Sequence, residues 1–276
     1  DVLGSRGLGD VYKRQIHKGV ADLSRRASMY HMQGLSFREY LNMFHGYDFP
    51  AYSLDDILQL KVTIPAGFRP FQYFSDYLKQ GYYPFPKNDY ENLLLQIVNV
   101  SIESDIPQYA GMNVSTARKL KQLLAVIAKS VPFKPNISSL ASVLNVSRNS
   151  VADYCLYIEE AGMIAQLRDD TGGIRGLGKV NKIYLDNTNL IYALGREGVE
   201  IGNVRETFFF NQLRVNQDVI TSSVSDFKID GYTFEVGGRK KGQKQIEGID
   251  NAFVVKDDIE YGHGNVIPLW TFGFNY

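Results

Sequence analysis

The chain is poor in the residues on which disulfide-stabilised and zinc-stabilised folds depend. Its 276 residues include one cysteine, Cys155, and four scattered histidines. A single cysteine excludes an intramolecular disulfide, and the histidines do not have the spacing of zinc ligands. No apolar run approaches the roughly 20 residues that a membrane-spanning helix needs. We therefore expect a cytoplasmic protein without a membrane partner, held together by hydrophobic cores.

Acidic residues are missing between Asp105 and Asp153, although the formal net charge of the whole chain is zero. The basic residues in that interval are Arg118, Lys119, Lys121, Lys129, Lys134 and Arg148. Such a window is either a solvated basic face paired with acids elsewhere in the fold or a surface that faces phosphate groups. Charge alone leaves both interpretations open.

The elements predicted around this window favour a nucleic-acid interpretation. Helices are predicted over residues 116–129, 137–144 and 148–161, and strands over 163–168 and 180–185. Their candidate N-caps are Ser115, Asn136 and Ser147. Three short helices followed by a β-hairpin is the layout of a winged helix. We therefore predict a winged-helix domain over residues 113–195.

In a winged helix, the first residues of the third helix face the major groove of DNA. Here these residues are Ser147, Arg148, Asn149 and Ser150. Arginine and asparagine suit base edges, and serine suits a phosphate. At the tip of the hairpin, Lys179 together with Arg168 and Arg175 would reach the DNA backbone. We expect DNA as a partner, and the alternative is a winged helix that contacts only proteins.

Glycine-rich segments are present, but none completes a nucleotide-binding loop. Residues 1–15 have three glycines without a preceding strand or a following Gly-Lys-Ser/Thr. We expect this stretch to be an unstructured tail or an assembly artefact outside the fold. Residues 173–179 fit the first seven positions of a Walker A motif, but Val180 stands where a hydroxyl would bind magnesium. We therefore expect no ATP hydrolysis by this chain alone.

Three motifs give the first half of the chain a family resemblance. They are GLSFREY at residues 34–40, GYYP at 81–84 and IESDI at 102–106. In this order and spacing they resemble the helical lid of a prokaryotic AAA+ ATPase family whose members end in a domain of unknown function. The resemblance assigns residues 16–112 to a remnant of the ATPase domain with its lid, and it covers nearly everything after residue 15.

The resemblance implies that the chain is the C-terminal fragment of a longer ATPase. Its parent would bind ATP and Mg²⁺ through Walker A and Walker B motifs that this chain lacks, so we expect no tight nucleotide binding here. Arg25 and Arg26 match the arginine that senses the γ-phosphate or reaches a neighbouring subunit of the same protein. The alternative for both arginines is a salt bridge on a helix surface.

Residues 196–276 resemble the restriction-endonuclease-like core of the same family, and residues 205–213 are predicted to form an amphipathic helix. Asp226 and Glu235 match the carboxylates that hold magnesium in active members, and Glu206 is a candidate third catalytic and metal ligand. Gly237 stands at the position of the usual lysine, so the site lacks an ammonium group unless Arg239 or Lys240 reaches back. The resemblance therefore implies a degenerate nuclease fold that is kept for DNA binding or scaffolding.

The glycine-rich basic turn over residues 237–245 has two interpretations. It either cradles phosphate or is a solvated turn after a core strand. For the whole chain we predict an α+β multidomain fold: a lid remnant, a winged helix-turn-helix and a restriction-endonuclease-like α/β domain. The alternatives are a stand-alone DNA-binding regulator and a metal-dependent DNA nuclease.

Overall fold

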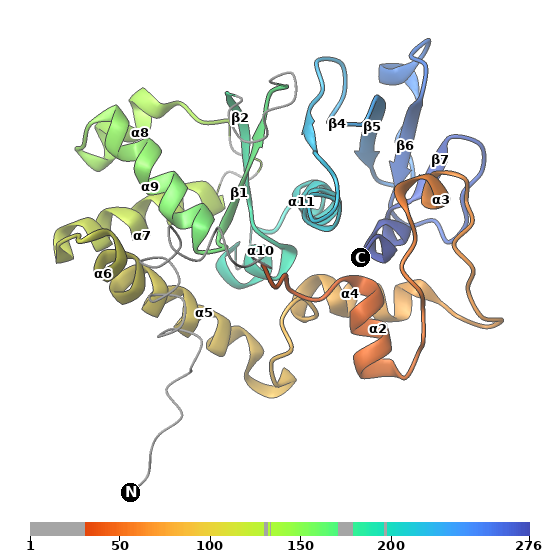
Figure 1. The fold of residues 1–276 in the computed structure, drawn as a ribbon, viewed down its shortest axis with the longest axis horizontal. Coiled ribbons are helices and arrows are strands. Elements are labelled where there is room, and N and C mark those ends of the chain that lie inside the picture. Colours follow the sequence, from red (N-terminus) through yellow and green to blue (C-terminus); the bar gives the residue numbers. More distant parts are fainter. Residues whose placement is uncertain (1–30, 130–131, 133, 171–178, 196–197) are drawn as a thin grey trace, which may run out of the picture.

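The structure is a computed structural model that describes residues 31–129, 132, 134–170, 179–195 and 198–276. The predictions for residues 1–15, for Arg25 and Arg26, and for the 173–178 part of the Walker-like loop lie outside these residues. The fold is mixed: helices account for most of the described residues between 36 and 160, and the strands of a sheet come after them in the chain (Figure 1). The predicted α+β class is confirmed. None of the described helices is both long and apolar enough to cross a membrane.

Ser36 and Ser53 cap the first two of the described helices, and Pro70 begins the third. The first helices are α2 (Phe37–His45), α3 (Leu54–Leu58), α4 (Pro70–Gln80), η1 (Lys87–Asp89), α5 (Tyr90–Val100), η2 (Ser101–Asp105) and α6 (Ile106–Ala110). The Ser36 hydroxyl accepts a hydrogen bond from the Glu39 amide at 3.1 Å, and the Glu39 carboxylate accepts one from the Ser36 amide at 3.0 Å. This capping box satisfies amides that the first turn leaves without partners.

The middle of the chain contains the three helices and the β-hairpin that the sequence predicted. Its elements are α7 (Val114–Lys129), α8 (Ile137–Leu144), α9 (Arg148–Glu160), β1 (Ile164–Arg168), β2 (Val180–Leu185) and α10 (Thr188–Gly195). Asn136 and Ser147 cap α8 and α9 as predicted. The predicted Ser115 cap is wrong, because the Asn113 side chain accepts the hydrogen bond from the Thr116 amide at 3.1 Å.

The β-hairpin of this segment is part of a larger sheet. β1 pairs with β2 in antiparallel orientation and with β3 (Ile220–Thr221) in parallel orientation, through Arg168 and Ile220. Seven strands of the described residues form this sheet in the order β2-β1-β3-β4-β5-β6-β7. The remaining elements are β4 (Phe227–Ile229), β5 (Tyr232–Gly237), η3 (Lys244–Ile246), β6 (Ala252–Lys256), β7 (Val266–Pro268) and η4 (Leu269–Phe274). The hairpin is therefore continuous with the C-terminal strands.

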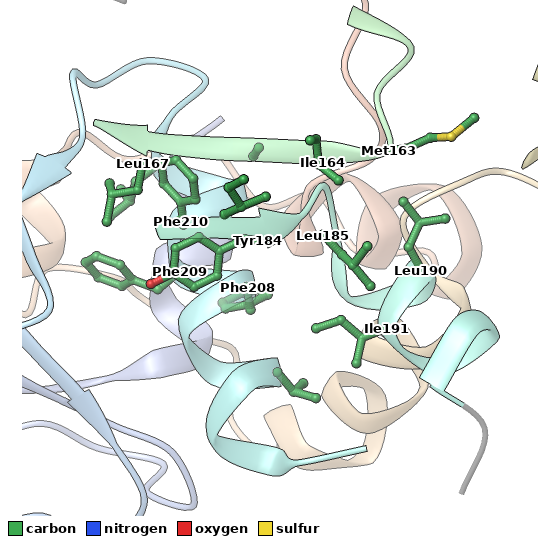
Figure 2. Packing of buried hydrophobic residues seen from close by; sticks show 14 of the residues in the cluster. Met163, Ile164, Leu167, Tyr184, Leu185, Leu190, Ile191, Phe208, Phe209 and Phe210 are labelled. Carbon is green, nitrogen blue, oxygen red and sulfur yellow. The ribbon is translucent and has the colours of Figure 1, made fainter. Parts of the chain in front are cut away.

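The helix α11 (Ile201–Leu213) packs against this sheet and differs from the amphipathic helix predicted from the sequence. Every residue from Thr207 to Leu213 is buried. Phe208 packs on Phe74 of α4, while Phe209 packs on Phe227 of β4. Figure 2 shows Leu167 and Tyr184 of the hairpin beside Phe209 and Phe210 of the same helix, and the rings of Tyr184 and Phe210 lie 5.3 Å apart, centroid to centroid. Because α11 has neighbours on all sides, its polar residues are buried as well.

The first helices share this core with the C-terminal segment. The ring of Phe37 lies 5.1 Å from that of Phe74 and 6.0 Å from that of Phe274, centroid to centroid. The Gln212 side chain accepts a hydrogen bond from the Phe37 amide at 3.3 Å and donates one to the Tyr77 hydroxyl at 3.0 Å. One hydrophobic cluster thus extends through all three predicted segments. The domain boundaries placed at residues 112 and 195 stay predictions.

Candidate functional site

The first turn of α9 presents the residues that we predicted to face DNA. Ser147, Arg148 and Asn149 are exposed, and Ser150 is partly buried. The Ser147 hydroxyl accepts a hydrogen bond from the Ser150 amide at 3.1 Å, which fixes the start of the helix. Asn145, with a φ of 50°, makes the left-handed turn between α8 and α9. The sequence therefore folds into a helix-turn-helix with an arginine and an asparagine at its exposed N-terminal turn.

The basic window around this turn is only partly paired with acidic groups. Lys121 forms an ion pair of 2.8 Å with Glu103, and the Lys119 ammonium donates to the Asn145 carbonyl at 3.2 Å. Among the six basic residues, Lys121 alone forms an ion pair with a described residue, and the other five form none: Arg118, Lys119, Lys129, Lys134 and Arg148. This pattern favours the phosphate-facing interpretation over a fully paired surface.

The face available to DNA on α9 is short. Asp153 is exposed one turn after Asn149, and Leu156 is exposed beyond it. A carboxylate at that position would repel phosphate groups. Contact with a nucleic acid is therefore favoured at the first turn of the helix and disfavoured further along it.

Of the hairpin residues that the sequence predicted to contact the DNA backbone, one is engaged by an acidic residue instead. Arg168 lies 3.4 Å from the Glu159 carboxylate, which also accepts a hydrogen bond from the Gln166 side chain at 2.7 Å. These contacts hold Arg168 against α9. Lys179 is exposed as predicted. Arg175 lies outside the described residues.

The three predicted carboxylates converge beside the hairpin. Glu206 comes from α11, Asp226 directly precedes β4, and Glu235 lies in β5. A lysine of β2, Lys182, places its ammonium 3.3 Å from Glu206 Oε2 and 3.7 Å from Asp226 Oδ1. The Tyr184 hydroxyl donates to the same Glu206 oxygen at 2.7 Å. The sequence analysis missed Lys182, because its partners lie far along the chain and no local spacing connects them.

The third carboxylate, Glu235, is 1% exposed and has its own cation. The Lys241 ammonium contacts Glu235 Oε1, and the Ser225 hydroxyl donates to Oε2 at 2.6 Å. The expectation that only Arg239 or Lys240 would supply an ammonium is wrong, because both are exposed while Lys241 turns inward. The basic turn over residues 237–245 therefore contributes one cation, Lys241, to the carboxylate site.

The environment of Asp226 favours its neutral form. Burial and the neighbouring Glu206 raise the pKa of the Asp226 carboxyl to about 6, and Glu235 adds to this effect. The Val236 amide, which donates to Asp226 Oδ2 at 2.9 Å, and the Lys182 ammonium lower the same pKa. Asp226 therefore changes its charge close to neutral pH. Burial and Glu206 also raise the pKa of the Tyr184 hydroxyl.

The fit of a divalent cation to this site depends on two carboxylates. The Lys182 ammonium contacts both Glu206 and Asp226, whereas both Glu235 oxygens have the partners Lys241 and Ser225. No group of three or more acidic, histidine or cysteine side chains in the described ranges is arranged to hold a metal ion. Magnesium often binds through one or two carboxylates plus water and substrate phosphates. Glu206 and Asp226 fit that mode, and they would have to release Lys182.

Comparison with known proteins gives one family match. Residues 72–200 match the model of a family described as a domain of unknown function (DUF8612). The matched segment runs from α4 to the residue before α11, and it includes the helix-turn-helix and the hairpin with Lys182. No curated protein and no solved structure matches the chain. Glu206, Asp226 and Glu235 lie beyond the matched segment.

Proposed function

We propose that this chain binds duplex DNA through the first turn of α9. The observation that carries this proposal is the exposure of Arg148 and Asn149 at the capped N-terminus of the second helix of a helix-turn-helix. The amides of a helix N-terminus favour anions, and these two side chain types read guanine and adenine edges. A window without acidic residues precedes this turn.

The DNA-binding proposal is tested by titrating a labelled duplex with the wild type and with the Arg148→Ala variant. Weaker binding of the variant at low salt supports the proposal. Equal affinity of the two proteins would contradict the assignment of the first turn of α9 to the major groove. A winged helix used only for protein contacts would show no salt-dependent binding to any duplex.

We further propose that this DNA-binding chain serves an AAA+ ATPase, with ATP and Mg²⁺ held by motifs upstream of it. The support is the resemblance of the motifs at residues 34–40, 81–84 and 102–106. In such a protein, Arg25 and Arg26 would sense the γ-phosphate or contact a neighbouring subunit. Tight, magnesium-dependent ATP binding by the chain alone in a calorimetric titration would contradict this assignment, as would a parental reading frame without a Walker A motif.

A second candidate function is Mg²⁺-dependent DNA cleavage at the carboxylate site. The observation that favours it is the pairing of Lys241 with Glu235, since the missing lysine was the reason to expect a degenerate site. Cleavage of plasmid DNA that requires Mg²⁺ and is lost in Asp226→Asn and Glu235→Gln supports this function. Intact plasmid at high protein concentration would favour a degenerate site kept for scaffolding.

A further inference from the structure

Position 237 has no room for a side chain. Gly237 lies in β5 two residues after Glu235, so a side chain at 237 would point to the same face of the sheet as Glu235. A Cβ atom built on Gly237 would lie 2.6, 2.7 and 2.8 Å from Cγ, Cβ and Cδ of Lys241. Real Cβ atoms do not come this close to other carbons. The stem of Lys241 thus fills the space that a side chain at position 237 would use.

The loop after β5 holds Lys241 in this place. The Lys241 amide donates to the Gly238 carbonyl at 2.8 Å, which closes a tight turn. Its ammonium contacts Glu235 Oε1 and donates to Gln245 Oε1 at 3.1 Å. Lys241, four residues after the motif ends at Gly237, therefore presents its charge beside Glu235, the carboxylate with which the motif begins.

We infer that Lys241 supplies the ammonium group that position 237 lacks, and that Gly237 is the residue that makes room for it. This inference rests on the second candidate function, DNA hydrolysis at the carboxylate site. In that reaction, a water oxygen bonds to phosphorus and one P–O ester bond breaks. The departing oxygen and the solvent take the two water protons, which leaves a phosphomonoester and an alcohol.

Lys241 acts in this reaction as a positioning residue and as a fixed positive charge. Bound Mg²⁺ would supply the charge that lowers the pKa of the attacking water. The Lys241 ammonium holds the buried Glu235 carboxylate in its orientation, and it places positive charge where the phosphate becomes more negative. These roles require the ammonium beside Glu235, whichever main-chain position carries it.

The test is an exchange of the two residues. The single variant Lys241→Gly removes the ammonium together with the Cβ that would clash with a side chain at 237. The double variant Gly237→Lys/Lys241→Gly restores an ammonium group, now carried by position 237, where related sites have their lysine. The matched control is Lys240→Gly, which changes an exposed lysine in the same turn. For each protein we would measure plasmid cleavage with Mg²⁺ and the midpoint of thermal unfolding.

We expect Lys241→Gly to lower cleavage by about 100-fold and the exchange to recover at least about tenfold of that loss. Lys240→Gly should stay within about threefold of wild type. If the wild type cleaves DNA and Lys241→Gly cleaves it at the same rate, the inference is overturned while the nuclease function stands. An exchange that recovers the unfolding midpoint without cleavage would overturn it too, because Lys241 would then only stabilise the fold.

If the wild type does not cleave DNA, the nuclease function is excluded. The unfolding midpoints then test whether the Lys241 side chain takes the place of a lysine at position 237. Loss of a partner for a buried carboxylate should lower the midpoint of Lys241→Gly by about 5 °C or more. Recovery of the unfolding midpoint in the exchange variant would support the inference that Lys241 replaces a lysine at position 237. A midpoint that stays low in the exchange variant would overturn this inference.

Discussion

The ammonium of Lys182 lies 3.3 Å from the carboxylate of Glu206, and this contact joins the β-hairpin of the helix-turn-helix segment to the central helix α11. Both side chains are less than one-fifth exposed. A pair in such surroundings is costly to break, because the remaining charge keeps the burial penalty without its partner. The contact therefore links the stability of the hairpin to that of the carboxylate site.

Replacement of Lys182 by methionine should destabilise the protein by about 2 to 3 kcal/mol, because Glu206 and Asp226 would face each other without their shared cation. The measurement is the free energy of unfolding from urea denaturation at pH 7.5. The matched control is Lys228→Met on β4, where the lysine is exposed. Its effect should stay below about 0.5 kcal/mol. Equal effects of the two variants would show that the Lys182 contact has no special weight.

The raised pKa of Asp226 predicts a stability that falls as the pH rises. The folded-state pKa of about 6 exceeds the ordinary value of 3.8, so the fold favours the protonated carboxyl. This contribution is complete below pH 3.8 and is lost as the pH rises through 6. Asp226→Asn, which keeps the side chain neutral, should therefore be more stable than wild type at pH 8 by on the order of 2 kcal/mol.

Urea titrations of both proteins at several pH values between 4 and 8 check this prediction. The difference between Asp226→Asn and wild type should be near zero at pH 4, grow up to about pH 6 and then level off. A difference that does not change with pH would mean that the Asp226 carboxyl does not titrate in this range.

DNA binding should separate side chains that read bases from those that contact phosphate. Arg148→Ala should cost about 1 to 3 kcal/mol and relax sequence preference, because arginine pairs with guanine edges. Lys134→Ala should weaken all duplexes alike and reduce the slope of log affinity against log salt by about one unit. Fluorescence anisotropy at several salt concentrations measures both. Identical salt slopes for the two variants and wild type would contradict the predicted roles.

The exposed Asp153 should oppose DNA binding. Asp153→Asn removes a negative charge one turn beyond Asn149, so it should raise the affinity for any duplex by about two- to fivefold at low salt, and less at high salt. The comparison variant is Glu247→Gln, which removes an exposed acidic charge near η3. A similar gain in both variants would indicate a general effect of net charge instead of a local one.

The buried Asn189 should hold α10 to the first helices. Its amide donates to the carbonyls of Tyr77 at 3.0 Å and Leu78 at 2.9 Å, and its oxygen accepts from the Tyr82 amide at 2.8 Å and from the Tyr90 hydroxyl. Asn189→Leu leaves these buried groups without partners, so it should cost about 2 to 4 kcal/mol of unfolding free energy. Asn181→Leu, on the exposed side of β2, is the control and should cost less than about 1 kcal/mol.

Local structure was predictable where it depends on nearby residues. The caps at Asn136 and Ser147 and the strand at residues 180–185 appear as predicted, because a cap needs only a side chain within three residues and a short strand is indicated by its β-branched and aromatic residues. The prediction failed at α11. Every residue from Thr207 to Leu213 is buried by elements from distant parts of the chain, so no amphipathic pattern describes this half of the helix.

The sequence by itself determined the helix-turn-helix with its exposed Arg148 and the three acidic residues that the resemblance selected. Only the tertiary structure decided that Lys182 and Lys241 supply the cations of the carboxylate site. Lys182 reaches its partners because β2 is paired within the sheet. Lys241 reaches Glu235 because a turn brings it back, and the aliphatic part of its side chain fills the space next to Gly237. These contacts depend on the packing of the sheet against α11 and the following loop, and no spacing along the chain encodes them.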